Sequence, residues 1–173
     1  MSLDIRIASR KDAERVAQLA KDTFVATFAE DNSRENLASY VETAFSLEVI
    51  SAELADPASI YMWAEEQGIP AGYAKMRRGN AAECITGPKP VELQRIYAVS
   101  NQIGVGVGKS LLNMCIKLAK AEGFQTLWLG VWEHNARAIE FYSRQGFVDV
   151  GFHDFMLGKD QQKDRLMQLD LRR

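Results

Sequence analysis

The chain is poor in the residues that form disulfide frameworks and metal centres. Its 173 residues include only two cysteines, Cys84 and Cys115, and two histidines, His134 and His153. Structural zinc sites need four such ligands at characteristic spacings, and these four residues are scattered along the chain. We therefore expect no metal site and no disulfide on which the fold depends.

Strong net charge and long apolar runs are also missing. The formal net charge is −2, whereas general nucleic-acid binding depends on a basic surface. No segment approaches the roughly 20 apolar residues of a membrane span. The first residues, MSLDIRIASRKD, are charged too early for a signal peptide. We expect a cytoplasmic protein without nucleic-acid or membrane partners.

The composition and length are those of a globular domain. Hydrophobic residues make up 47% and charged residues 25% of the sequence, which is typical of soluble domains that bury a core. A length of 173 residues lies in the usual range for one domain, and no linker or repeat interrupts the chain. We expect a single domain over residues 1–173.

Hydrophobic periodicity predicts seven strands and five helices. Ser9 is the expected N-cap of the first helix, with Asp12 as its capping-box partner, and residues 67–70 (QGIP) form an expected hairpin turn. The expected strands are 3–8, 59–66, 71–79, 91–99, 126–132, 147–156 and 164–171, and the expected helices are 10–28, 35–45, 46–55, 108–122 and 136–145. This order places a βαβ unit beside antiparallel strands, so we expect an α/β (α+β) fold whose mixed sheet has helices on its faces.

The segment 102-QIGVGVGKSLL-112 follows an expected strand and opens a helix. Glycines let the backbone approach a ligand closely, and the unpaired N–H groups at a helix start attract anions. Two phosphate-binding templates miss by one residue each. A Walker A loop needs glycine where Ile103 stands, and the dinucleotide fingerprint needs glycine where Lys109 stands. The segment predicts a phosphate-binding loop of another kind, with a tight turn that binds no ligand as the alternative.

Two segments, ELQRIYAVSNQIGVGVGKSLL and LWLGVWEHNARAIEFYSRQGF, resemble the Gcn5-related N-acetyltransferase (GNAT) family. The family pattern N-x-x-A-x-x-x-Y-x-x-x-G-F is fully matched from Asn135 to Phe147. The family's loop pattern is matched at Gly106 and Gly108, but Ile103 stands where the family has glutamine or arginine. The resemblance implies a mostly antiparallel sheet of about seven strands with helices on both faces, and a homodimer.

The resemblance also answers which phosphate compound the loop holds. In this family the loop binds the pyrophosphate of acetyl-CoA, the cosubstrate, chiefly through backbone N–H groups. The resemblance implies that the pantetheine arm lies along the preceding strand at Ile96 and Ala98. The loop residues implied in pyrophosphate binding are Ile103, Gly104, Val105, Gly106, Val107, Gly108 and Lys109.

The same resemblance implies roles in catalysis. Tyr142 would protonate the departing thiolate, because a phenol of pKa near ~10 is protonated at neutral pH; a core aromatic is the alternative. Asn135 would contact the cofactor, or serve only as a helix N-cap. The backbone N–H of Ala98 would polarise the thioester carbonyl. Glu92 is the candidate general base, acting through water, and Glu133 is the second candidate; either could instead be an ordinary surface carboxylate.

The N-terminal half is similar to PaiA-type bacterial polyamine N-acetyltransferases, through the patterns TF-x-x-TF, N-S-x-E-N and Y-x-E-x-AF between residues 23 and 45. This resemblance implies a small-molecule amine acceptor, such as spermidine or spermine. Trp132 would wall the acceptor site, unless it is a core residue. The acidic residues that would attract a polycation, unless they form a solvated helix face, are Glu30, Asp31, Glu35 and Glu42.

Three other functions remain open at this stage. The acceptor could be a protein or peptide amine, or the chain could be a non-catalytic regulator that binds acyl-CoA, as the departure at Ile103 would allow. A P-loop kinase is the third. No catalytic serine or cysteine paired with histidine is evident, which favours direct transfer to the amine over a covalent acyl-enzyme.

Overall fold

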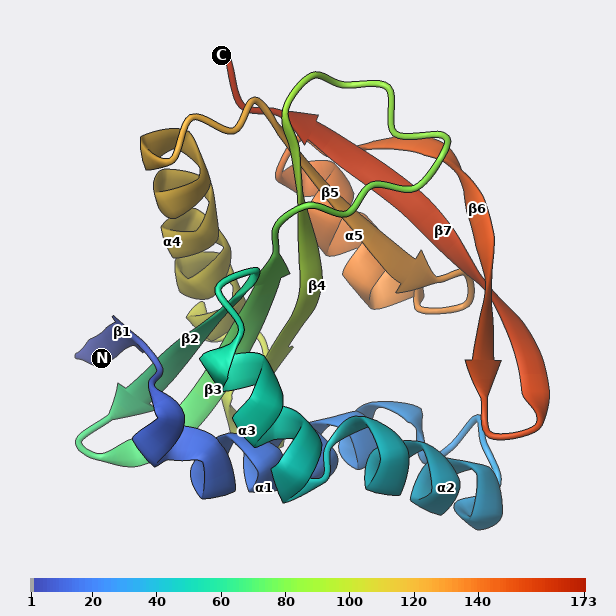
Figure 1. Ribbon diagram of the computed structural model, residues 1–173. Helices are drawn as coiled ribbons and strands as arrows, with labels where there is room; N and C mark the ends of the chain where they lie inside the picture. Colours follow the sequence, from blue (N-terminus) through green and yellow to red (C-terminus); the bar gives the residue numbers. More distant parts are fainter. Residues whose placement is uncertain (1) are drawn as a thin grey trace.

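The computed structural model describes residues 2–173, and its centre is one sheet of seven strands in the order β1-β2-β3-β4-β5-β7-β6 (Figure 1). Within residues 2–173 only β4 and β5 pair in parallel, so the expected mixed, mostly antiparallel sheet is confirmed. The strands are β1 (Leu3–Ile7), β2 (Ser59–Glu66), β3 (Ile69–Arg77), β4 (Pro90–Ala98), β5 (Thr126–Trp132), β6 (Val148–Leu157) and β7 (Asp160–Asp170).

In the described part of the chain, five α-helices cover the two faces of the sheet. They are α1 (Ala13–Phe28), α2 (Arg34–Ala44), α3 (Leu47–Ala55), α4 (Val107–Ala121) and α5 (Ala136–Arg144), with short 3-10 turns η1 (Arg10–Asp12) and η2 (Ser100–Gln102). Figure 1 shows α1, α2 and α3 grouped together and α4 apart from them. Across residues 2–173, every helix is too short or too polar to span a bilayer.

Strand β2 shows why both faces carry helices. Because successive side chains of a strand point to opposite faces, Ile60 and Met62 pack in the core beneath α4 and α5, whereas Tyr61 and Trp63 pack against α1, α2 and α3. All four side chains are buried. An apolar run without alternation, SIYMW, therefore becomes a central strand covered on both sides.

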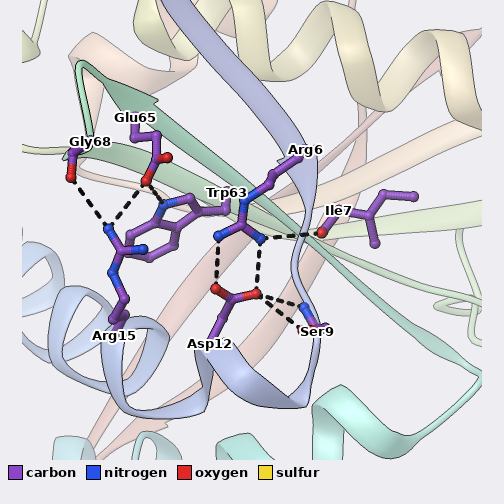
Figure 2. Close-up of polar contacts among 8 residues, drawn as sticks. All are labelled: Arg6, Ile7, Ser9, Asp12, Arg15, Trp63, Glu65 and Gly68. Atoms are coloured by element: carbon purple, nitrogen blue, oxygen red, sulfur yellow. Dashed lines mark hydrogen bonds and ion pairs between the residues drawn. The ribbon is translucent and has the colours of Figure 1, made fainter.

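The start of α1 follows the capping prediction in part. The Asp12 carboxylate accepts a hydrogen bond from the Ser9 backbone N–H at 2.8 Å, as expected, but a 3-10 turn precedes the helix proper. The same carboxylate pairs with the Arg6 guanidinium of β1 through contacts of 2.8 and 2.9 Å. Figure 2 shows this pair beside a second one, Arg15 and Glu65. Together they attach α1 to the edge of the sheet.

The two hairpins test the turn predictions. β2 and β3 are joined by Gln67 and Gly68, both with positive φ, which confirms the expected hairpin. The last hairpin is longer than predicted, since β7 begins at Asp160 and not at residue 164. The polar run DQQKD hid this part of the strand, but Leu157 pairs with Asp160 across a two-residue turn that contains Gly158 at φ 61°.

Candidate active site

The site begins where β4 and β5 separate. Only Pro90, Val91 and Glu92 of β4 pair with β5, and Glu92 stands opposite Trp128. Beyond this pair the two strands diverge, as Figure 1 shows. On its other edge β4 keeps its pairing with β3, apart from a bulge at residue 94 that bends the strand further. The sheet is therefore open along the second half of β4.

A cavity of about 300 Å³ fills this opening. Its walls come from both faces of the sheet, with α5 contributing on one side and α1 and α2 on the other. The lining residues are Phe24, Phe28, Tyr40, Phe45, Arg77, Glu92, Leu93, Gln94, Arg95, Ile96, Tyr97, Gly130, Val131, Trp132, Asn135, Ala138, Tyr142, His153, Phe155, Gln162 and Asp164. A substrate in this cavity is accessible to groups from both faces.

The open edge of β4 offers backbone donors. The N–H of Val99 donates to the carbonyl oxygen of Ala71 of β3 at 2.9 Å. Since successive N–H groups along an extended strand point to opposite edges, those of Ala98 and Ile96 point away from β3, to the edge that β5 has left. The two backbone positions expected to contact the pantetheine arm therefore face the gap.

The glycine turn lies at the end of β4, between η2 and α4. Gly104 and Gly106 have φ of 85° and 101°, values that residues other than glycine rarely adopt. The space beside their α-carbons, where a β-carbon would stand, is open. The first hydrogen bond of α4 runs from the Ser110 N–H to the Gly106 carbonyl at 3.0 Å. The N–H groups of residues 107–109 precede that bond, so they stand where a helix start attracts an anion.

The side chains of this turn contribute little to an anion site. Ile103 and Val105 are 40% and 52% exposed, and the Ile103 N–H makes only a long 3.5 Å contact with the Ser100 carbonyl. Gly108 lies next to α5, because a β-carbon there would stand 3.9 Å from the Phe141 ring. The turn and α5 are thus neighbours, although the turn does not line the cavity.

Helix α5 brings Asn135 and Tyr142 to the cavity. The Asn135 side chain accepts a hydrogen bond from the Ala138 N–H at 3.2 Å, so its expected role as N-cap is confirmed. Tyr142 is buried, and its hydroxyl hydrogen-bonds to no other side chain or backbone group of residues 2–173. Burial raises the pKa of Tyr142 above its ordinary value, so the hydroxyl stays protonated at neutral pH.

The two candidate bases lie in different surroundings. Glu92 is buried on the cavity wall, where its Oε2 accepts hydrogen bonds from Arg77 at 3.0 Å and Asn80 at 2.9 Å. Its Oε1 makes no such contact within residues 2–173. Glu133 lies outside the cavity lining and approaches His134 at 3.4 Å. The structure thus brings Glu92, and not Glu133, to the site.

The acceptor side of the cavity is aromatic and not acidic. The acidic residues expected to attract a polycation (Glu30, Asp31, Glu35 and Glu42) are all exposed and outside the cavity lining. Trp132 does line the cavity, and its ring meets that of Phe28 edge to face at 6.0 Å. Phe24 and Tyr40 stack at 4.5 Å beside it. The motif residues of α1 and α2 therefore contribute rings to this wall.

Sequence reasoning missed the charged residues of the cavity on β4, β6 and β7. Arg95 lies with its guanidinium 4.7 Å from the Phe45 ring and 3.6 Å from the Glu53 carboxylate. Asp164 and His153 approach each other at 3.4 Å on neighbouring strands. No spacing in the sequence marks these residues, because they meet only through strand register. Asp164 ends the polar run DQQKD, and nothing within that run distinguishes it from its neighbours.

A buried charge cluster supports the floor of the cavity. Glu53 of α3 contacts the ammonium group of Lys75 at 3.0 Å, the guanidinium of Arg95, and the hydroxyl of Tyr61. Lys75 is only 2% exposed. Burial, together with the nearby Arg95, lowers the pKa of Lys75 to about 8. One carboxylate thus holds two cations in place between α3 and the sheet.

Chemically, the cavity combines a protonated phenol, backbone donors on an open strand edge, and carboxylates within one enclosed space. Such an arrangement suits the attack of a nucleophile on a carbonyl, since donors can stabilise the negative charge that develops and an acid can protonate the leaving group. Outside the cavity, the glycine turn leads into the N–H groups of residues 107–109, at a helix start of the kind that attracts anions.

Comparisons with known proteins agree with this chemistry. Residues 13–147 match the model of the acetyltransferase (GNAT) family. An uncharacterized N-acetyltransferase in the pepI 3' region of Lactobacillus delbrueckii subsp. lactis is 33% identical over 160 residues, covering 92% of both chains. The spermidine N(1)-acetyltransferase of Thermoplasma acidophilum is 26% identical over 165 residues, covering 92% of this chain and 98% of the relative.

Solved structures show the same architecture. The PaiA N-acetyltransferase from Thermoplasma acidophilum, crystallised in complex with coenzyme A, superposes with a TM-score of 0.79 at 23% identity, covering 98% of this chain and 99% of that one. At this identity the likeness concerns the fold alone, which the two chains share over nearly their whole length. The family match and the 33% identical relative go further: the chain belongs to the GNAT family of acetyltransferases.

Proposed function

We propose that the protein transfers acetyl from acetyl-CoA directly to a primary amine, and that a polyamine such as spermidine or spermine is the acceptor. It does so as one domain over residues 1–173. The observation that most supports this function is the gap between β4 and β5. There a free strand edge and Tyr142 stand next to an aromatic wall built from the opposite face.

The glycine turn fits the diphosphate of the donor. Gly104 and Gly106 have a positive φ that residues with a side chain rarely adopt, and the space beside their α-carbons is open. The N–H groups of residues 107–109 make no hydrogen bond within the helix. Acetyl-CoA supplies the activated acetyl thioester. Residues 103–109 hold its diphosphate, and the open edge at Ile96 and Ala98 holds the pantetheine arm. Ile103 provides no side-chain donor, so backbone groups carry the binding.

Tyr142 is the general acid of this proposal. Burial keeps its hydroxyl protonated, and a thiol has a pKa of about 8–9, so the departing thiolate is a suitable acceptor for the proton. Asn135 fixes the start of α5 and thereby the direction from which Tyr142 enters the cavity. The backbone N–H of Ala98 polarises the thioester carbonyl from the open edge.

The attacking amine must lose a proton, and Glu92 is the base predicted for this step. Its Oε2 is held by Arg77 and Asn80, which fixes the carboxylate. Oε1 remains available to a water molecule in the cavity. The water-mediated role of Glu92 stays a prediction. Asp164, to which the next section assigns the same proton, is the rival base, and thiol release by Glu92→Gln and by Asp164→Asn separates the two.

Two observations support a cationic acceptor. The rings of Phe24, Phe28, Tyr40 and Phe45, which carry the TF-x-x-TF and Y-x-E-x-AF patterns, line the cavity, and aromatic faces attract ammonium groups. A relative of the chain is named a spermidine N(1)-acetyltransferase. The donor and the acceptor would then reach the reaction centre from opposite faces of the sheet.

An acceptor screen tests the proposal. Release of the CoA thiol from acetyl-CoA would be followed with spermidine, spermine, a simple monoamine, and peptides that offer a lysine or a free N-terminus. We expect turnover of the polyamines and none of the peptides. Turnover of the peptides alone would assign the activity to protein amines. Binding of acetyl-CoA without thiol release from any amine would make the protein a regulator.

A further inference from the structure

We infer that Asp164, with His153 behind it, binds the ammonium group of the acceptor and takes up the proton that this amine loses. This inference deepens the proposed function and rests on it. Its basis is a row of side chains across three strands, at the aromatic end of the cavity.

Register places the three side chains of this row on one face of the sheet. Asp164 of β7 stands opposite Trp132 of β5 on one side and opposite His153 of β6 on the other. Directly opposed residues in antiparallel strands share a face, and all three line the cavity. The Trp132 ring meets Phe28 of α1, so this is the face that α1 and α2 cover. The carboxylate therefore stands within the aromatic wall.

Gly130 provides the room for this pair. A β-carbon at Gly130 would stand 3.3 Å from Asp164 Oδ2 and 3.4 Å from His153 Nε2, tighter than ordinary van der Waals contact. Gly130 and Trp132 are two residues apart on β5, so their positions share a face. The absence of a side chain at Gly130 thus leaves the Asp164 carboxylate and the imidazole side by side at the cavity.

Asp164 is a partly buried carboxylate that contacts no lysine or arginine within residues 2–173. Its side chain is 16% exposed, and within residues 2–173 its polar side-chain contact is His153 Nε2 at 3.4 Å. Burial raises the pKa of Asp164, although the nearby His153 acts to lower it. The other ionisable groups that face it are Tyr40 of α2 and Tyr97 of β4. A buried charge of this kind is costly unless a cation completes it, and an ammonium ion would do so.

Glu92, the other carboxylate of the cavity, differs in this respect. Arg77 contacts its Oε2 through two nitrogen atoms at 3.0 Å, one of which donates a hydrogen bond, and Asn80 donates a second hydrogen bond. The charge of Glu92 is thus already paired with a cation of the protein, so this carboxylate has less to gain from an ammonium group. Of the two, Asp164 is the group with the capacity to bind a new cation.

The proton transfer balances without an added reactant. The N–H bond of the ammonium breaks, its electron pair stays on nitrogen, and the proton goes to a carboxylate oxygen of Asp164. From there the proton passes to Nε2 of neutral His153, whose ring then releases a proton from Nδ1 to water. The His153 side chain is 41% exposed, so its ring has access to solvent. The neutral amine is left free to attack the thioester carbonyl.

Binding and turnover of matched variants test this inference. Asp164→Asn removes the charge at nearly constant shape, and Asp149→Asn removes an equal charge from an exposed position on β6. Glu92→Gln changes the other carboxylate of the cavity. Spermidine binding to protein saturated with CoA, which cannot react, would be measured by calorimetry at pH 7. Thiol release from acetyl-CoA would then be measured from pH 6 to 10.

We expect Asp164→Asn to weaken spermidine binding about 10- to 100-fold, the loss expected for a hydrogen bond to a charged group. At pH 7, kcat/KM should fall by ~10²–10⁴, and the deficit should shrink toward pH ~10, where the amine is already neutral. His153→Gln should show a smaller deficit with the same pH dependence. Asp149→Asn and Glu92→Gln should bind spermidine as the unchanged protein does.

Other results would overturn the inference. Unchanged spermidine affinity in Asp164→Asn, or no spermidine binding by the unchanged protein, contradicts the ammonium site. A deficit that is equal at all pH values would make Asp164 a structural residue. If spermidine binding depends on Asp164 but no thiol is released, the ammonium site stands and the proposed acetyl transfer to spermidine fails. Loss of folding is not expected, since the substitution removes a partly buried charge at nearly constant shape and should leave Tm equal or higher.

Discussion

Glu92 of β4 and Trp128 of β5 form the last pair of the parallel ladder. Beyond them β4 keeps its pairing with β3 but has a free second edge, while β5 continues beside β7. The backbone groups that would otherwise bond to β5 become available to a substrate, since an unpaired strand edge is a template for any extended partner. This separation of two strands creates the cavity on which each functional prediction depends.

Replacing Tyr142 by phenylalanine should lower kcat by ~10²–10⁴, because the thiolate would lose its general acid. Affinity for CoA, measured by calorimetry, should stay unchanged. Tyr73→Phe is the matched control, since the Tyr73 hydroxyl is buried without a hydrogen-bond partner in residues 2–173. That variant should keep full activity. Equal activity of Tyr142→Phe and the unchanged enzyme would refute the assigned role.

Replacing Ile103 by arginine should tighten CoA binding several-fold, by roughly the value of one charge-assisted hydrogen bond to the diphosphate. Ile103 is exposed, so the fold should tolerate the change without a shift in Tm. Val105→Arg, at another exposed position of the same turn, controls for a general gain of positive charge. Equal tightening in both variants would show that the effect is not specific to position 103.

Replacing Glu53 by glutamine should destabilise the fold by about 3–5 kcal/mol, because Lys75 and Arg95 would face each other without the carboxylate that holds both. Urea unfolding at pH 7 measures this loss. Glu48→Gln, at an exposed position of the same helix, should change the free energy of unfolding by no more than ~0.5 kcal/mol. A loss of similar size in both variants would contradict the role given to the cluster.

Lys75 should make stability rise with pH in the alkaline range. Its pKa is lowered to about 8 in the folded protein from 10.5, so between these values the unfolded chain binds more protons than the folded one. The unchanged protein should therefore gain up to about 3 kcal/mol over Lys75→Met between pH 8 and 10.5. Comparing urea unfolding of the two proteins cancels the contribution of the tyrosines. A constant difference across this range would contradict the prediction.

Asp12 should contribute stability that acid removes. The pKa of Asp12 is lowered from 3.8 to about 2, chiefly by the hydrogen bonds from Arg6 and also by the one from the Ser9 N–H. Burial of the carboxyl group opposes this shift. A depressed carboxyl pKa stabilises the fold above pH ~4, and this contribution is lost as the pH falls toward 2. Asp12→Asn should cost about 2 kcal/mol at pH 7 and little near pH 2. Asp22→Asn, exposed on α1, should change the unfolding free energy little at either pH.

The sequence alone predicted most of the helices and strands, and its candidate donor-side residues lie in contiguous motifs. Apolar spacing is local, so the pattern of α4 and the run TLWLGVW indicated a helix and a strand correctly. The turn at residues 102–110 and the N-x-x-A-x-x-x-Y pattern are contiguous motifs. Asn135 and Tyr142 lie on one helix, and their common face followed from its 3.6-residue period.

The acceptor side depended on tertiary structure. Asp164 and His153 are eleven residues apart and meet only because the β6–β7 hairpin starts earlier than its polar sequence suggests. The acidic residues expected near the acceptor lie in α2 and in the turn before it and face solvent, whereas the rings of the segment from α1 to Phe45 line the cavity. Charge attracts at a distance, but burial decides which side chains enter a cavity, and burial is fixed by strand register and helix packing over the whole fold.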